Sequence, residues 1–165
     1  MFVLGIDPGV SRCGYGCVEA NGRGGRAVAA GVLTTPPDQP LPQRLAALDH
    51  DLRALLAELT PDAVAVERVF FQVNARTAMS VGQASGLALA AAARAGCVVA
   101  QYTPNEVKQA VAGYGAAPKE QVTKMVQALL GLAEPPRPAD AADALALALT
   151  HLAMAPLRAR AAAAR

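Results

Sequence analysis

Four carboxylates are spaced along this 165-residue chain so that they could share a metal ion. Asp7 and Glu67 each follow a short apolar run, which places each at the carboxyl end of a buried strand. Asp140 and Asp143 stand three residues apart at the start of a predicted helix, so they lie on one face of it. Burying such carboxylates unpaired costs several kcal/mol, so their convergence requires cations.

The chemistry of this set favours a hard divalent cation. Carboxylate oxygens suit Mg²⁺, with Mn²⁺ able to substitute. Two such ions about 4 Å apart are the established arrangement for in-line cleavage of a phosphodiester. The simpler alternatives are that Asp7 caps the turn made by Pro8 and Gly9, and that Asp140 only interacts favourably with a helix dipole.

The apolar periodicity predicts the elements that would position these carboxylates. Three consecutive strands are followed by helix, strand, helix, strand and further helices. This order predicts an α/β fold with a mixed five-stranded sheet, its first three strands antiparallel, flanked by helices. The expected strands are 2–6, 14–20, 27–33, 63–67 and 97–101, and the expected helices are 43–59, 74–94, a short one from 103, 118–130 and 139–154.

Length and composition indicate one domain, over residues 1–154, with residues 155–165 a disordered tail. The net charge of +2 neither requires nor excludes nucleic acid, so any basic surface must be local. Three cysteines, an odd number without metal spacing, suggest a reducing compartment. With no signal peptide and no span for a bilayer expected, we predict a cytoplasmic protein without a membrane partner.

All three lysines of the chain fall within residues 108–124. Lys108, Lys119 and Lys124 stand in a segment that glycine and proline interrupt, so it can present charge beside the carboxylates. We interpret them as contacts to DNA phosphates, with solvated helix faces as the alternative, above all for Lys124.

Two further residues are DNA-binding candidates. Phe70 follows Glu67 closely, in a chain with only three phenylalanines, and an exposed ring there could stack on an unpaired base. Arg76, in the first turn of the next predicted helix, is a further phosphate candidate.

Small residues recur at every fourth position of that helix, at Ala78, Gly82, Gly86 and Ala90. Small side chains at this spacing leave a groove along the helix, in which another backbone can come close. The spacing predicts tight packing against the sheet or, alternatively, a helix–helix dimer interface.

Six short motifs, in order from residue 3 to about residue 152, resemble the RuvC family of Holliday-junction resolvases. As a set, the motifs that contain the carboxylates are highly specific, although the first alone is weak. They are Gly5-Ile6-Asp7-Pro8-Gly9, Gly14-Tyr15-Gly16, Glu67-Arg68-Val69-Phe70, Gly82-Gln83-Ala84, Val107-Lys108-Gln109 and Asp140-Ala141-Ala142-Asp143-Ala144-Leu145-Ala146.

The resemblance implies an RNase H-like fold, a homodimer and Mg²⁺-dependent paired nicking of four-way DNA junctions in recombination and repair. It implies that Asp7, Glu67, Asp140 and Asp143 are metal ligands, although some relatives carry His at the last position. It also implies that Lys108 and Lys119 contact the DNA backbone, that Phe70 is the wedge residue, and that the branch-migration complex RuvA–RuvB is a partner.

Three other functions remain open from the residues. A phosphate-binding turn of the actin and sugar-kinase type would need about twice this length and a second copy of the unit. A related nuclease that processes ribosomal RNA precursors would lack the Glu67 and Asp140–Asp143 motifs. A non-catalytic DNA-binding scaffold would leave the four carboxylates unexplained.

Overall fold

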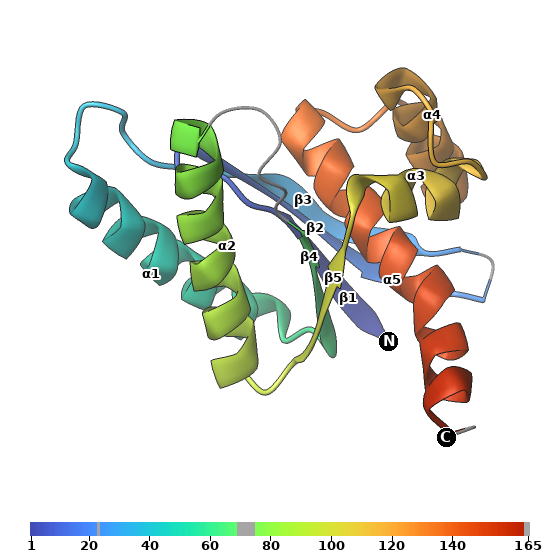
Figure 1. The fold of residues 1–165 in the computed structure, drawn as a ribbon. Coiled ribbons are helices and arrows are strands. Elements are labelled where there is room, and N and C mark those ends of the chain that lie inside the picture. The colour runs from blue at the N-terminus through green and yellow to red at the C-terminus, as the bar shows by residue number, and fades with distance from the viewer. Residues whose placement is uncertain (23, 69–74, 164–165) are drawn as a thin grey trace.

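The computed structural model describes residues 1–22, 24–68 and 75–163, and their side chains except those of residues 75–77 and 157–163. A five-stranded sheet in the order β3-β2-β1-β4-β5 forms its centre (Figure 1). The predicted α/β class with a mixed sheet is confirmed. The strands are β1 (Phe2–Asp7), β2 (Arg12–Glu19), β3 (Arg26–Thr34), β4 (Ala63–Glu67) and β5 (Val98–Tyr102).

The pairing of the strands brings two of the predicted residues together. β1 runs antiparallel to β2 and parallel to β4, and β2 runs antiparallel to β3. In the parallel pair Ile6 lies beside Val66. The next residues, Asp7 and Glu67, therefore leave the sheet side by side at the same edge.

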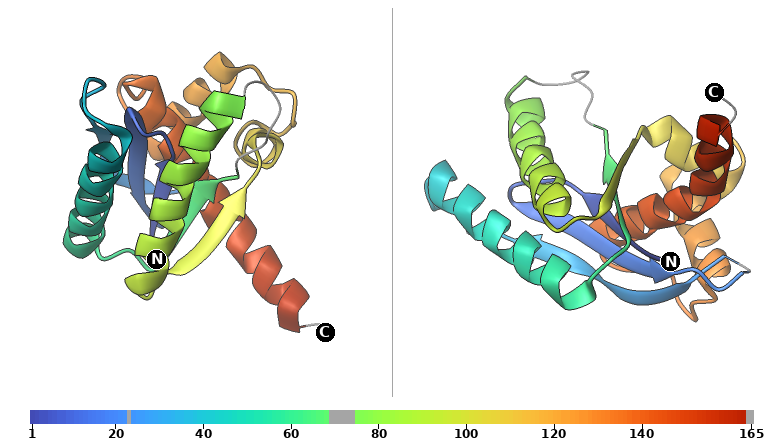
Figure 2. Two further views of the ribbon diagram at one scale, coloured as in Figure 1. Left: turned by 60° about the vertical axis from the view of Figure 1, so that its left-hand side comes forward. Right: turned by 90° about the horizontal axis from the view of Figure 1, so that it is seen from below.

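Helices cover both faces of the sheet. Figure 1 and the turned views of Figure 2 show helices packed on each side of the sheet. The apolar residues divide accordingly into two buried clusters, one on each side of the central strands. The first face carries α1 (Leu41–Leu59) and α2 (Ala75–Arg94), and the second carries α3 (Pro104–Ala112), α4 (Lys119–Leu130) and α5 (Ala139–Ala163).

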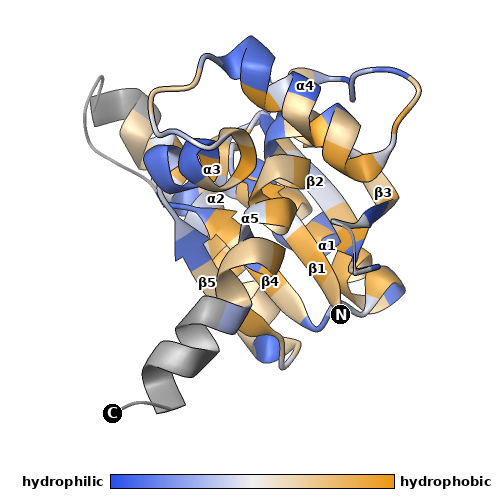
Figure 3. Ribbon diagram, turned by 90° about the vertical axis from the view of Figure 1, so that its right-hand side faces the viewer, coloured by the Kyte–Doolittle hydropathy of each residue, from blue (hydrophilic) through white to orange (hydrophobic). Residues whose placement is uncertain are grey.

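Helix α5 lies almost on the backbone of the sheet, and its apolar length runs across the strands in Figure 3. A Cβ atom at Gly5 would clash with the carbonyl oxygen of Ala144, and one at Gly14 would clash with that of Asp140. Glycine in β1 and β2 and alanine in α5 therefore permit the close approach. This contact fixes the first turn of α5 above the ends of β1 and β2.

Helix α5 is longer than predicted. We expected it to end near Met154, but it continues past Pro156 to Ala163. The added residues are mostly alanine and arginine, which are strong helix formers, and they outweigh the single proline. The division into a domain over 1–154 and a disordered tail over 155–165 stays a prediction.

The small-residue positions of α2 do not pack against the sheet as one interpretation predicted. Only Ala78 of the four is buried, whereas Gly82, Gly86 and Ala90 are exposed. A Cβ atom at Gly82 or Gly86 would meet no described atom within 4 Å. Packing against the sheet is therefore wrong for three of the four positions.

No helix in the described ranges is both long and apolar enough to cross a bilayer.

Candidate active site

The ends of two parallel strands and the start of one helix deliver the four predicted carboxylates to one edge of the sheet. Asp7 ends β1, Glu67 ends β4, and Asp140 and Asp143 lie in the first two turns of α5. The Asp7 carboxyl is hydrogen-bonded to Glu67 and is repelled electrostatically by Glu67, Asp143 and Asp140. The structure thus brings all four carboxylates together.

Burial and mutual repulsion change the protonation of this cluster. Burial, followed by the charge of Glu67 and its hydrogen bond, raises the pKa of Asp7 to about 8. Burial also raises the pKa of Glu67, while the hydrogen bond from Asp7 opposes that rise. Near neutral pH the pair therefore retains a proton, which Asp7 donates to Glu67.

Two cations neutralise the carboxylates of α5. Arg12 donates from Nε and Nη2 to the same oxygen, Oδ2 of Asp140, at 3.0 and 2.7 Å. Lys119 Nζ donates to Oδ2 of Asp143 at 2.6 Å, and this hydrogen bond is the main cause of the raised pKa of Lys119. Both basic side chains are more than half exposed, so each pair contributes less to stability than its short distance suggests.

The donor set fits a hard divalent cation by its chemistry. Four carboxylates meet, and their negative charge is balanced by the proton on the Asp7–Glu67 pair and by the side chains of Arg12 and Lys119. A hard divalent cation supplies the same positive charge. Among the described residues, however, no three His, Cys, Asp or Glu side chains are arranged so that they could hold one ion. Asp140 is instead paired with Arg12, and Asp143 is paired with Lys119.

A groove of about 230 Å³ opens beside the carboxylates. Its charged lining residues are Glu67, Asp143, Lys108 and Lys119, and the other lining residues are apolar. The structure therefore places two of the three predicted lysines at the cluster. Lys124 lines none of this groove and instead pairs with Glu120 at 2.8 Å on the exposed side of α4.

Two predicted DNA-binding residues cannot be placed. Phe70 lies outside the described residues. Arg76 belongs to helix α2, but its side chain lies outside the described part of the chain. Their roles stay predictions.

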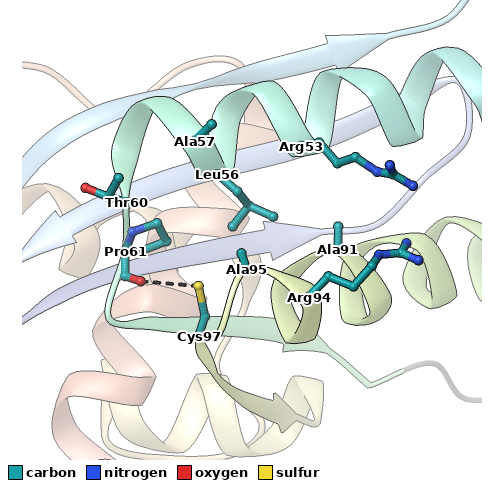
Figure 4. A pocket seen from close by; sticks show the side chains of 9 residues that line it. All are labelled: Arg53, Leu56, Ala57, Thr60, Pro61, Ala91, Arg94, Ala95 and Cys97. Carbon is teal, nitrogen blue, oxygen red and sulfur yellow. Dashed lines mark hydrogen bonds between the residues drawn. The ribbon is translucent and has the colours of Figure 1, made fainter.

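A second, larger hollow lies between the carboxyl-terminal halves of α1 and α2, at the opposite end of β4 from Glu67 (Figure 4). It measures about 490 Å³ and is lined mostly by small apolar side chains. Its charged residues are Arg53 and Arg94, which share the carboxylate of Asp49 at 2.6 and 3.7 Å. A hollow without a carboxylate of its own does not suit a cation-dependent reaction.

Sequence reasoning missed two basic residues, one that contacts the cluster and one that contacts the turn after Asp7. Arg12 follows Asp7 by five positions and contacts Asp140 from the other side of the turn. Arg44, on α1, hydrogen-bonds to Ser11 in that turn at 2.5 Å. Arg12 could have been found from its place just after the turn, but Arg44 carries no sequence signal, because the fold alone brings α1 to the turn.

Comparison with known proteins gives a consistent family. Residues 3–151 match the family described as crossover junction endodeoxyribonuclease RuvC. A protein of that name from Salinispora arenicola is 59% identical over 165 residues, which span 99% of this chain and 94% of the relative. Another from Moorella thermoacetica is 54% identical, over 97% of this chain and 96% of the relative.

Solved structures agree. Thermus thermophilus RuvC superposes with a TM-score of 0.89 at 43% identity, covering 96% of this chain and 97% of that one. The same protein in complex with a Holliday junction substrate gives 0.90 at 43% identity, covering 96% of each chain. The yeast mitochondrial resolvase Ydc2, at 14% identity and a TM-score of 0.63, shares the fold. This chain belongs to the RuvC family of crossover junction endodeoxyribonucleases.

Proposed function

We propose that this protein resolves four-way DNA junctions in recombination and repair by cutting two strands symmetrically. Each cut hydrolyses a phosphodiester and leaves a 5′-phosphate and a 3′-hydroxyl. The observation that carries the proposal is the meeting of Asp7, Glu67, Asp140 and Asp143 at one sheet edge, in a chain of this family.

The family depends on a divalent metal ion. The proposed ion is Mg²⁺, which Mn²⁺ can replace, with two ions in each active site held by Asp7, Glu67, Asp140 and Asp143. When bound, such a pair activates the attacking water and stabilises the leaving oxygen.

The residues of the chain prepare the site for that chemistry. Asp7 and Glu67 would hold a metal ion only after losing their shared proton, and the charge of that ion would favour their anionic forms. Asp140 and Asp143 belong to a helix that rests on the sheet, so the backbone positions of these two residues are set before DNA arrives.

The proposed DNA contacts extend from this cluster. Lys108 and Lys119 line the groove beside Glu67 and are placed to bind phosphates next to the scissile one. Phe70 is the proposed wedge between bases, and Arg76 and Lys124 are proposed phosphate contacts farther along the DNA.

Two symmetric cuts need two active sites, which a homodimer supplies. The exposed small-residue face of α2 supports this proposal, because Gly82, Gly86 and Ala90 leave room for a second helix and Met79 beside them is 65% exposed. In the cell, the proposed location is the cytoplasm and the proposed partner is the RuvA–RuvB branch-migration complex.

A cleavage assay tests the proposal. A four-way junction labelled in turn on each strand is incubated with the protein and Mg²⁺, beside linear duplex and an RNA hairpin, with a chelator as control. We expect paired nicks in opposing strands of the junction, ends that ligase can seal, and no cutting with the chelator. Equal cutting of duplex and junction would contradict junction selectivity, and cutting of the RNA hairpin alone would favour a role in RNA processing.

A further inference from the structure

Arg44 is tied to the turn that follows Asp7. Its Nη2 donates to the hydroxyl of Ser11 at 2.5 Å, and its Nε donates to the hydroxyl of Thr35 at 3.0 Å. The Thr35 hydroxyl is buried and donates to the carbonyl of Val10 at 2.7 Å. The guanidinium is therefore held in one place, beside the turn that links Asp7 to β2.

The charge of Arg44 has no counter-ion in the described part of the chain. Arg12, Arg26, Arg53 and Arg94 each lie within 4 Å of a carboxylate, whereas Arg44 forms no such pair with a described residue. Two hydroxyls accept two of its five N–H bonds. A half-buried guanidinium with spare donors is well suited to an anion, and a phosphate matches its planar geometry.

The strand order places Arg44 opposite the lysines already described. Ser11 and Thr35 lie at the ends of β2 and β3, on one side of Asp7. Lys108, on α3, and Lys119, on α4, line the groove that contains Glu67, at the end of β4. In the strand order, Asp7 at the end of β1 lies between the ends of β2 and β3 on one side and Glu67 with this groove on the other.

We propose that Arg44, together with Ser11, binds a backbone phosphate of the DNA substrate on the β2–β3 flank. The strand to be cut is then held on both sides of the carboxylates, by the lysine groove and by Arg44. The inference rests on the proposed function, because it takes DNA as the ligand.

The salt dependence of binding tests this contact without using cleavage. The Asp7→Asn protein and its double variants are titrated with a four-way junction at several salt concentrations. Adding Arg44→Gln should weaken binding several-fold and reduce the slope of log K against log[salt] by about one phosphate contact. Arg44→Lys should retain most of the slope, because it retains the charge.

Arg53→Gln is the matched control. Arg53 is also an arginine of α1, but it is paired with Asp49 and lines the hollow between α1 and α2, away from the Asp7 cluster. It should leave the salt slope unchanged.

A second variant covers the case in which Arg44→Gln fails to fold. Ser11 is exposed, so Ser11→Asp leaves the core intact and places a carboxylate beside the guanidinium. It should lower junction affinity and the salt slope together.

The possible results separate the alternatives. An unchanged slope in folded Arg44→Gln or in Ser11→Asp overturns the phosphate contact, and loss of cleavage alone would leave Arg44 as a positioning residue. If the Asp7→Asn protein does not bind a junction at all, the proposed function itself fails. That failure is distinct from junction binding that is insensitive to Arg44.

Discussion

The acidic side chains at the two ends of strand β1 lie in opposite environments. At the amino end, the Asp62 carboxylate accepts a hydrogen bond from the backbone N–H of Phe2 at 2.7 Å. In the middle of α1, Asp49 lies within 4 Å of two arginines, Arg53 and Arg94. At the carboxyl end, Asp7 is buried against other carboxylates and is hydrogen-bonded to one of them.

The difference separates acids that hold the fold from acids that need something outside it. A carboxylate that meets a backbone donor is stabilised as an anion within the protein. A carboxylate that meets other carboxylates keeps its proton or recruits cations, and here both occur, through Asp7, Arg12 and Lys119. The carboxyl end of β1 is therefore incomplete without an external cation, whereas the amino end is complete.

Among the variants that test this difference between the two ends, Asp7→Asn should have the largest effect, and that effect should be on cleavage. Asparagine retains the shape but loses the anionic oxygen that a metal needs, so cleavage should fall on the order of 10³-fold or more, equivalent to about 4 kcal/mol or more in the barrier. Junction binding should persist in a gel-shift assay. Loss of binding together with cleavage would contradict the ligand assignment.

Two lysines of α4 provide the next test. Lys119 contacts Asp143 at the cluster, whereas Lys124 pairs with Glu120 on the exposed face. Lys119→Ala should lower the cleavage rate by about 10²–10³-fold, the loss typical of removing one donor that stabilises charge developing in the transition state. Lys124→Ala should lower the cleavage rate less, because Lys124 pairs with Glu120 on the exposed face and its proposed phosphate contact lies away from the reacting phosphate. Equal losses would show that both lysines serve DNA binding in general.

The raised pKa of Asp7, at the carboxyl end of β1, should make the stability of the protein depend on pH. In the folded state Asp7 retains its proton up to about pH 8, while in the unfolded chain it releases it near its ordinary 3.8. The folded state binds more protons between these values, so this group makes the metal-free protein less stable as the pH rises from about 4 to about 8.

Thermal melts in the presence of a chelator test whether the stability falls as the pH rises. Asp7→Asn should melt above the wild type by a few degrees at pH 8 and by less at pH 5. Added Mg²⁺ should raise the wild-type midpoint more than that of the variant. If the melting midpoints of Asp7→Asn and the wild type differed by the same amount at pH 5 and at pH 8, the raised pKa of Asp7 would be contradicted.

The smallest effect is expected at the amino end. Asp62→Ala removes one hydrogen bond to the N–H of Phe2, which should cost about 1 kcal/mol of unfolding free energy and lower the melting midpoint by about 2–4 °C. The cleavage rate of the folded variant should equal that of the wild type. A large loss of cleavage would show that the two ends are coupled through β1.

Much of this site could be predicted from local sequence. Asp7 and Glu67 end apolar runs, and parallel pairing of those runs puts them side by side. Asp140 and Asp143 share a helix face that had to pack on the sheet. The capping box of α3, in which Thr103 and Glu106 exchange hydrogen bonds, was also readable from its spacing.

What could not be predicted depends on contacts between distant segments. Arg44 reaches Ser11 across 33 positions, and Arg12 reaches Asp140 across 128. No periodicity encodes such pairs. The exposed face of α2 was misjudged for a related reason: Gly82 and Gly86 permit close packing but do not specify which partner uses it.

The seating of α5 on the sheet has a consequence for how the enzyme should fail on heating. Because Gly5 and Gly14 leave no gap beneath the helix, its first turn cannot shift without opening the central strands. Asp140 and Asp143 thus have no independent local unfolding step by which to leave Asp7. Heat inactivation should therefore coincide with loss of tertiary structure, so that one cooperative transition governs both the nuclease and its fold.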